Sequence, residues 1–266
     1  MKKFKLGILG VGKMGSSILE GIIKASLFKK DEILLFDTNN EIKNEYVKKD
    51  FTFTDNEKDL VEHVDILLLA IKPQMLYSLK NTKFDIENIL VISIVAGKNI
   101  SDLKEIFGSQ KFIRVMPNTP ALINEGATAI GRNNLVNEEE LNIVCKIFSS
   151  IGGAKIIPDE LLNEVIPLNG SMPAYLYYFA KCFIEKGVKD GITYEDAKEL
   201  VSRAIIGSAK MIIESNKDID TLINDVCSPK GATLEGMNVL KESNFRKIVE
   251  ETSEKTVKRA YELSKI

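Results

Sequence analysis

A cluster of closely spaced glycines lies near the start of the chain, where Gly10, Gly12 and Gly15 form a Gly-x-Gly-x-x-Gly pattern that includes Lys13 and Met14. The pattern follows a short apolar run and precedes helical spacing, the context in which such loops bind phosphate. The first glycine permits a tight turn, the second admits a pyrophosphate, and the third lets helix and strand pack closely. We therefore expect these five residues to bind a dinucleotide at a helix N-terminus. The alternative for this segment is a plain strand-to-helix turn.

An acidic residue, Asp37, ends the next apolar run, about 20 residues beyond the glycine loop. An acid at this distance hydrogen-bonds the ribose hydroxyls of NAD and repels a 2′-phosphate. No arginine follows among Thr38, Asn39 and Asn40, so this reasoning favours NADH. Lys43 could still reach a phosphate, and the expected cofactor is therefore NADPH or NADH.

Three further segments complete a recognisable order along the chain. They are Leu69-Ala70-Ile71-Lys72-Pro73-Gln74, Arg114-Val115-Met116-Pro117-Asn118-Thr119-Pro120-Ala121 and Ser228-Pro229-Lys230-Gly231-Ala232-Thr233. With Gly170-Ser171 and Pro173-Ala174-Tyr175, this order resembles pyrroline-5-carboxylate reductases. The resemblance extends from the glycine loop to the final helix, and the combination is specific although no single segment is.

The resemblance implies NAD(P)H-dependent reduction of 1-pyrroline-5-carboxylate to L-proline, the last step of proline biosynthesis. It also implies that Asn56, Ala70, Lys72 and Ala96 lie along the cofactor. These residues sit at or beyond the carboxyl ends of predicted strands, where α/β folds bind their ligands.

Small residues at a helix start point to the substrate site. Gly231, Ala232 and Thr233 would direct several backbone N–H groups into one concavity, which suits the carboxylate of the substrate. The resemblance implies that Thr233 hydrogen-bonds the ring nitrogen, and we expect Thr233 and Ser171 to be the catalytic residues. The alternative for this segment is an ordinary helix start, with Pro229 near the first turn.

Two segments on the substrate side depart from the family pattern. The loop before Pro-Ala-Tyr usually reads Ser-Gly-Ser-Gly, whereas here it is Asn169-Gly170-Ser171-Met172. The glycine pair after Ser-Pro becomes Lys230-Gly231. We expect Asn169 and Lys230 to face the substrate, although Lys230 could point to solvent instead. A related cyclic imine acid is therefore an alternative substrate.

The pattern of apolar residues changes at about Pro158. Before it, strand and helix patterns alternate, which predicts a Rossmann-type, doubly wound α/β domain over residues 1–158. After it, helical periods dominate, with Thr193–Ser215 and Asn244–Ser264 the longest, so residues 159–266 are predicted to form an all-helical domain for substrate binding and dimerisation. The predicted strands are Lys5–Leu9, Ile33–Phe36, Asp65–Ala70, Ile89–Val95, Lys111–Val115 and Ala127–Ile130.

One predicted helix, Ala174–Ala180, is apolar or aromatic on every side. Such a helix must be buried all round. In so small a domain this indicates burial against a second subunit, with a place at the centre of the domain as the alternative. The family resemblance implies interlocked dimers, so we expect a homodimer or a larger homo-oligomer built from dimers.

Composition excludes several other classes of protein. Hydrophobic residues make up 44% and charged residues 28%, and the net charge of -2 gives no basic excess for nucleic acid or an anionic membrane. No segment approaches the ~20 apolar residues of a membrane helix. Three scattered cysteines fit neither a zinc pattern nor a disulfide framework. We expect a cytoplasmic enzyme without a metal, whose single histidine, His63, lies at the surface.

Two other functions remain open from the sequence. A β-hydroxyacid dehydrogenase also joins a Rossmann domain to helices, and it needs a lysine for proton transfer. Lys181 and Lys186 are candidates for that role, but neither lies in a matching motif. The second alternative is a non-catalytic relative that senses NAD(P)H, since a fold does not fix function.

Overall fold

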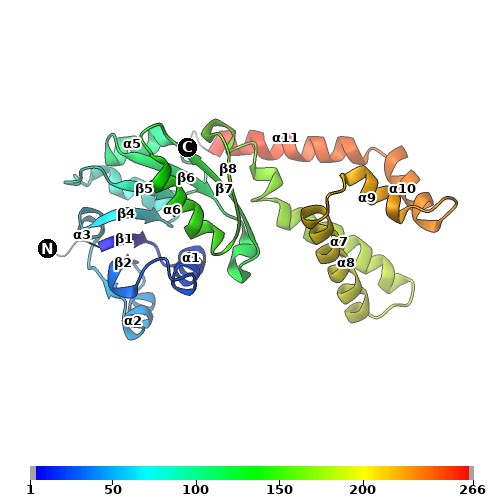
Figure 1. Ribbon diagram of the computed structural model, residues 1–266, viewed down its shortest axis with the longest axis horizontal. Helices are drawn as coiled ribbons and strands as arrows, with labels where there is room; N and C mark the ends of the chain where they lie inside the picture. The colour runs from blue at the N-terminus through cyan, green and yellow to red at the C-terminus, as the bar shows by residue number, and fades with distance from the viewer. Residues whose placement is uncertain (1–3, 264–266) are drawn as a thin grey trace. The chain divides into compact units, whose positions relative to one another are not determined.

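The computed structural model describes residues 4–263, within which eight strands form one sheet in the order β3-β2-β1-β4-β5-β6-β7-β8 (Figure 1). Neighbouring strands run parallel except β6 and β7, which are antiparallel. The order of the first six strands is that of dinucleotide-binding folds. The predicted doubly wound α/β class is confirmed. The strands are β1 (Phe4–Leu9), β2 (Ile33–Phe36), β3 (Thr52–Phe53), β4 (Val64–Leu69), β5 (Leu90–Ser93), β6 (Lys111–Met116), β7 (Gly126–Arg132) and β8 (Gly152–Ile156).

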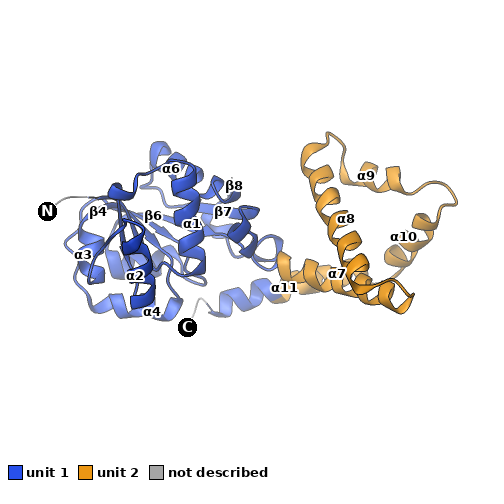
Figure 2. Cartoon of the chain, turned by 90° about the horizontal axis from the view of Figure 1, so that it is seen from below, with its two compact units in different colours: residues 1–171, 256–266 blue, residues 172–255 orange. Residues whose placement is uncertain are grey.

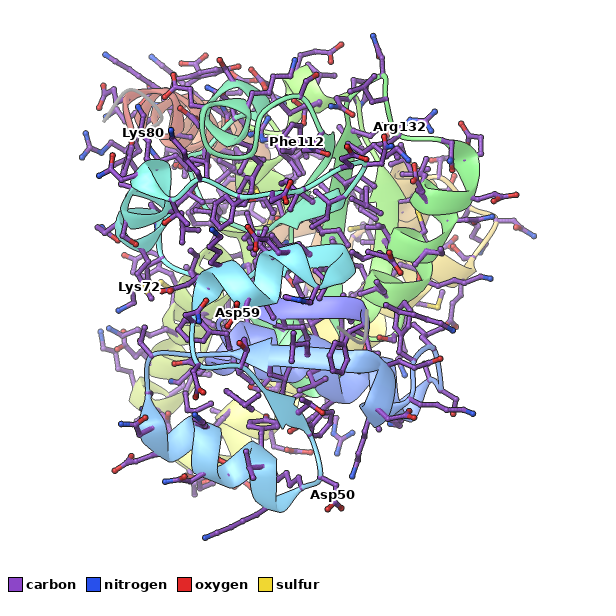
Figure 3. All side chains as sticks on the ribbon, turned by 90° about the vertical axis from the view of Figure 1, so that its left-hand side faces the viewer. Asp50, Asp59, Lys72, Lys80, Phe112 and Arg132 are labelled. Atoms are coloured by element: carbon purple, nitrogen blue, oxygen red, sulfur yellow. The ribbon has the colours of Figure 1, made fainter. Side chains whose placement is uncertain are left out.

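Apolar side chains on both faces of the sheet build two separate cores. In β4, Ile66 and Leu68 join one core, whereas Leu67 and Leu69 join the other, because side chains alternate along a strand. Phe112 of β6 is fully buried in the second core (Figure 3). Burial on both faces explains the near-continuous apolar runs of the central strands. The first core is covered by α1 (Lys13–Lys24), α2 (Asn40–Lys48) and α6 (Glu138–Ser149), and the second by α3 (Glu57–Glu62), α4 (Pro73–Ser78) and α5 (Ile100–Phe107).

The chain divides into two compact units (Figure 2). Unit 1 comprises the residues up to Ser171 together with those from Thr256, and unit 2 comprises Met172–Lys255. Unit 1 therefore extends past the expected boundary at residue 158, because the segment that follows is tied to the sheet. Arg114 of β6 binds the Asp159 carboxylate at 3.0 Å. The expected domain boundary between residues 158 and 159 stays a prediction.

Unit 2 is helical, as the sequence predicts. Its helices are α7 (Met172–Lys189), α8 (Tyr194–Glu214), α9 (Ile219–Val226), α10 (Ala232–Glu242) and most of α11 (Phe245–Leu263). Ser264, the expected end of the last helix, lies outside the described residues. In the described part of α11, Tyr261 belongs to unit 1, where its hydroxyl donates to Glu164 at 2.6 Å. That hydrogen bond raises the pKa of the Tyr261 phenol above its usual value.

Unit 2 contains almost no buried side chains. Among residues 172–255, all of them described, only Pro173 and Ala197 are buried. On α7, Tyr177 is 67% exposed and Tyr178 is 70% exposed. The alternative that Ala174–Ala180 lies at the centre of the helical domain is therefore wrong. Side chains that are exposed in a single chain are available for burial against a second subunit, so this exposure is consistent with the expected dimer.

Other expectations from composition can be compared with the described residues. His63 follows α3 at the surface, with its Nδ1 atom 2.7 Å from the Asp59 carbonyl oxygen. Within residues 4–263 no group of His, Cys, Asp and Glu side chains could hold a metal ion. No described helix combines the length and the hydropathy needed to cross a bilayer.

Candidate functional site

The glycine loop has the geometry that a bound pyrophosphate requires. Gly10 has a φ of +95°, and a Cβ there would lie 2.6 Å from the Ala70 carbonyl oxygen. A Cβ on Gly15 would lie 2.1 Å from the Gly10 carbonyl oxygen. A Cβ on Gly12, in contrast, would meet no atom within 4 Å. The first and third glycines therefore make close backbone contacts, whereas the second leaves open space for a ligand.

Helix α1 begins at Lys13, and the N–H groups of its first turn are able to bind an anion. Its N-cap, Gly12, provides no side-chain hydrogen bond, and its first turn contains no acidic residue. The first N–H groups of a helix lack partners within it and carry the positive end of the dipole. Lys13 is exposed beside them, whereas Met14 packs against the core. The contribution of Met14 to a phosphate site is thus limited to its backbone.

Asp37 at the end of β2 is bound to the loop itself. Its Oδ2 atom accepts the Val11 N–H at 2.7 Å, and its Oδ1 atom accepts the Asn39 N–H at 2.9 Å. The carboxylate therefore fixes the glycine loop in place, a role that the sequence alone did not indicate. Each oxygen keeps a further lone pair, and the expected contact with a ribose stays a prediction.

The other expected cofactor residues differ in their surroundings. Asn56 is the N-cap of α3, where its Oδ1 atom accepts the Asp59 N–H at 2.8 Å and its Nδ2 atom donates to the Asp59 carboxylate at 2.7 Å. Ala70 follows β4 and its N–H donates to Leu9 of β1 at 2.8 Å. Lys72 and Ala96 are exposed beyond β4 and β5, and Lys72 lies at the periphery in Figure 3. Ala70, Lys72 and Ala96 thus share the carboxyl edge of the sheet with the glycine loop.

Side chains connect α1 to the loop that follows β6. The Ser17 hydroxyl of α1 donates to the Ala121 carbonyl at 2.8 Å, within the short helix Thr119–Ile123. Asn118, at the start of that loop, is buried, and its Oδ1 atom accepts the Ala127 N–H of β7 at 2.9 Å. The sequence pattern identified the loop but could not have revealed either contact, because both depend on how strands and helices pack.

Asn169 belongs to the same region, although it was expected to face the substrate. Its side chain is buried, and its Nδ2 atom donates to the Met116 carbonyl at 2.8 Å and to the Ala127 carbonyl at 3.1 Å. Ser171 follows, partly exposed, with its N–H bonded to the Ile166 carbonyl at 2.9 Å. Both donors of the Asn169 amide are therefore occupied by backbone and unavailable to a substrate.

The Ser-Pro-Lys-Gly segment of unit 2 forms a turn before α10. The Gly231 N–H donates to the Ser228 carbonyl at 2.9 Å, so one N–H of the expected concavity is already used. The N–H groups of Ala232 and Thr233, in the first turn of α10, have no partner within residues 4–263. Thr233 is exposed, and no hydrogen bond of its hydroxyl exists in the described part of the chain. These groups remain able to bind a carboxylate.

Lys230 occupies a position that favours glycine. Its φ of +60° lies in the left-handed region, which costs a residue with a Cβ about 1 kcal/mol. A Cβ on the neighbouring Gly231 would lie 2.9 Å from the Ser228 carbonyl oxygen, so that position tolerates no side chain. Lys230 is exposed, and no ion pair of its ammonium group occurs among the described residues.

The lysines that a hydroxyacid dehydrogenase would need are poorly placed for proton transfer. Lys181 is 3.6 Å from Glu185 and Lys186 is 2.6 Å from Asp190, each one helical turn along α7. Both side chains are more than half exposed. Catalytic lysines are usually desolvated, and this arrangement therefore gives no support to the dehydrogenase alternative.

Comparisons with known proteins cover both parts of the chain. The family model for pyrroline-5-carboxylate reductase dimerisation matches residues 159–263. A second model, described as NADP oxidoreductase coenzyme F420-dependent, matches residues 5–97. The pyrroline-5-carboxylate reductase of Escherichia coli is 32% identical over 265 residues, covering 98% of each chain.

Two solved structures are similar to this chain over its full length. The pyrroline carboxylate reductase of Plasmodium falciparum, with NADP bound, is 32% identical, has a TM-score of 0.85 and covers 99% of each chain. The pyrroline-5-carboxylate reductase of Coxiella burnetii is 26% identical, with a TM-score of 0.90 and complete coverage of both chains.

Two glycine variants test the phosphate loop. Gly15→Ala places a Cβ against the Gly10 carbonyl, and we expect a loss of stability of about 3 kcal/mol. Gly12→Ala meets no atom, and its φ of −69° suits alanine, so its stability should match the wild type. Its affinity for NADPH should nevertheless fall at least about tenfold, because the methyl group occupies the phosphate space. Thermal unfolding and fluorescence titration measure these effects, and wild-type affinity in Gly12→Ala would contradict the assignment.

Asp37 variants separate its two roles. Asp37→Ser removes both the charge and the acceptor for the Val11 N–H, so kcat/KM should fall with either cofactor. Loss of the charge should also raise the ratio of kcat/KM for NADPH over NADH, by about tenfold if 1.4 kcal/mol of repulsion is lost. Asp37→Asn keeps an oxygen for Val11 and should change mainly the ratio. An unchanged ratio in both variants would refute contact with the ribose.

Proposed function

The chain belongs to the pyrroline-5-carboxylate reductase family, and from that premise we propose which residues reduce 1-pyrroline-5-carboxylate to L-proline. The protein is an NAD(P)H-dependent oxidoreductase that acts on a C–N double bond in proline biosynthesis. The main support for the assignment is similarity over the whole chain to reductases of this name, combined with a glycine loop that leaves space beside Gly12.

The glycine loop and the carboxyl edge of the sheet are the proposed cofactor site. Gly10, Gly12 and Gly15 would hold the pyrophosphate, with the N–H groups at Lys13 and Met14 directed toward it. Asp37 would keep the loop in register while one of its oxygens accepts a ribose hydroxyl. Farther along the cofactor would lie Ala70, Lys72 and Ala96. For Asn56 we propose a backbone contact, because its side chain caps α3.

The reaction adds a hydride to the imine carbon while the electron pair of the C=N bond moves to nitrogen. When bound, the reduced nicotinamide supplies that hydride. The imine can bind already protonated, so the hydride neutralises an iminium and the chain needs no strong general acid. The task of the protein is therefore to orient the ring and to stabilise its charges until transfer is complete.

The start of α10 is the proposed substrate site. The free N–H groups of Ala232 and Thr233 would bind the carboxylate, and Gly231 would let it approach the backbone closely. The Thr233 hydroxyl would accept a hydrogen bond from the ring nitrogen and relay a proton when one is needed. Lys230 would add a positive charge beside the carboxylate, and for Ser171 of unit 1 we propose a catalytic hydroxyl.

A related cyclic imine acid is the second candidate substrate. The observation that favours it is Lys230, which is exposed and has no ion-pair partner among the described residues, at a position where the family pattern has glycine. No observation favours the non-catalytic sensor of NAD(P)H, and similarity to reductases over the whole chain speaks against it. A sensor has no need of a substrate pocket, and turnover of any imine would exclude it.

We also propose a homodimer, or a larger assembly of dimers, formed by the helical domain. Support comes from the exposed aromatic side chains of α7 and from the match to the family dimerisation model. A cytoplasmic location and the lack of a nucleic-acid partner remain proposals that rest on composition, including the net charge of -2.

The reductase assignment is tested by following oxidation of NADPH or NADH with 1-pyrroline-5-carboxylate and identifying proline as the product. Wild type should turn over with at least one cofactor. Thr233→Val preserves shape but removes the hydroxyl, and we expect kcat to fall about a hundredfold, whereas Thr233→Ser should retain most activity. No turnover by folded protein that still binds NADPH would favour a different imine or the sensor, and equal rates in all three proteins would refute the role of Thr233.

The dimer is tested by placing a charge on α7. Tyr178→Glu would bury a carboxylate in the proposed interface, at a cost of several kcal/mol, and we expect monomers by light scattering together with lost reductase activity. Val47→Glu is the matched control, since Val47 is 49% exposed on α2 of the nucleotide domain. A Tyr178→Glu protein that stays dimeric would contradict the interface.

A further inference from the structure

The buried side chains of Asn118 and Asn169 bind backbone groups at the point where β6 and β7 separate. The register of these antiparallel strands pairs Met116 with Ala129, and continuing it by two residues would place Asn118 opposite Ala127. There the Asn118 Oδ1 atom accepts the Ala127 N–H at 2.9 Å, and the Asn169 Nδ2 atom donates to the Ala127 carbonyl at 3.1 Å. Side chains thus replace the strand partner that Ala127 would otherwise need.

Asn169 also joins this strand end to the segment that leads into α7. Its Nδ2 atom donates to Met116, the last residue of β6, at 2.8 Å. Its own carbonyl accepts the Asn118 Nδ2 at 3.3 Å. A Cβ on the adjacent Gly170 would lie 3.9 Å from the Met116 sulfur, so the two segments pack at ordinary van der Waals distance. Asn169 therefore links the loop after β6 to the turn that carries Ser171.

The orientation of the Asn169 amide is determined by its partners. Both nearby acceptors are carbonyl oxygens, and only the nitrogen of an amide can donate to them. This orientation leaves the Oδ1 atom buried without a partner among the described residues. An unsatisfied buried oxygen costs about 1–3 kcal/mol. A serine, which the family pattern has at this position, would avoid that cost, so stability alone does not account for the asparagine.

We propose that Asn169 is a positioning residue for hydride transfer, acting through Met116 and Ala127 rather than by contact with the substrate. This inference rests on the proposed reductase function. The loop after β6 is also attached to α1 of the glycine loop through Ser17 and Ala121. Asn169 therefore links the turn that contains Ser171 to the loop after β6. Through that loop it is also linked to α1 at the proposed cofactor site. Hydride transfer requires the reacting atoms to be held at a defined separation, and small displacements lower its rate steeply.

The test compares Asn169→Ser and Asn169→Asp with wild type. Serine retains one donor for two carbonyls, and we expect kcat to fall about tenfold with KM for both substrates nearly unchanged. Aspartate has the same shape but presents only acceptors to the carbonyls, and it should lower kcat further. The deuterium isotope effect on kcat, measured with NADPH labelled at the transferred position, should rise as hydride transfer becomes the slow step.

Asn133 offers a matched control at the opposite end of the same strand pair. Its Oδ1 atom accepts the Phe112 N–H at 3.2 Å and its Nδ2 atom donates to the Gln110 carbonyl at 3.0 Å. It lies the length of β6 away from Asn169, roughly 17 Å for six residues. Asn133→Ser should lower the Tm by a similar amount while leaving kcat and the isotope effect unchanged.

The outcomes separate the inference from the function on which it rests. A lower kcat with a raised isotope effect in Asn169→Ser, but not in Asn133→Ser, supports positioning. Wild-type kcat and isotope effect in Asn169→Ser would overturn it, and so would equal losses in both serine variants. If Asn169→Asp does not fold, Asn169→Ser alone decides between these results. An inactive wild type that binds NADPH would overturn the reductase assignment and the inference together.

Discussion

The proposed cofactor site at the carboxyl edge of the sheet depends on the close approach of α1 to the turn that ends β1. No side chain fits at Gly15, since a Cβ would lie 2.1 Å from the Gly10 carbonyl oxygen. This contact directs the N-terminus of α1 toward the space beside Gly12, where its free N–H groups can act on a phosphate. Asp37 adds a second restraint through its bond to the Val11 N–H. Both restraints order the loop without a ligand, and a cofactor bound there as proposed would lose less entropy on binding.

The helical unit is under a different constraint, because it lacks a core within one chain. Pro173 and Ala197 alone cannot offset the conformational entropy of ordering five helices. The large exposed aromatic side chains of α7 must therefore be buried elsewhere to stabilise this unit. The proposed dimer would therefore couple stability to function, since the proposed substrate turn at Ser228–Thr233 belongs to the unit that the second subunit would stabilise.

The sequence predicted those features that depend on local patterns. Central strands such as β4 are apolar on both faces and were identified to within a residue or two. The edge strands β3 and β8 were missed, because β3 has only two residues and β8 lacks a buried apolar run. Patterns also could not show that Asn56 caps α3, or that Asn169 bonds to Met116, because these contacts depend on which elements meet in three dimensions.

Two local conflicts with ordinary stability rules lie on the proposed substrate side. Lys230 has a positive φ where glycine would be relaxed, and Asn169 buries an oxygen that has no partner within residues 4–263. Sequences that fold well usually agree with their structure at each position, and exceptions tend to mark functional sites. Both exceptions fall where this chain departs from the family pattern, whereas the glycine loop follows that pattern. The proposed cofactor loop therefore keeps the close contacts that its fold requires, whereas the two conflicts mark the proposed substrate side as the part of this chain whose residues are not explained by stability alone.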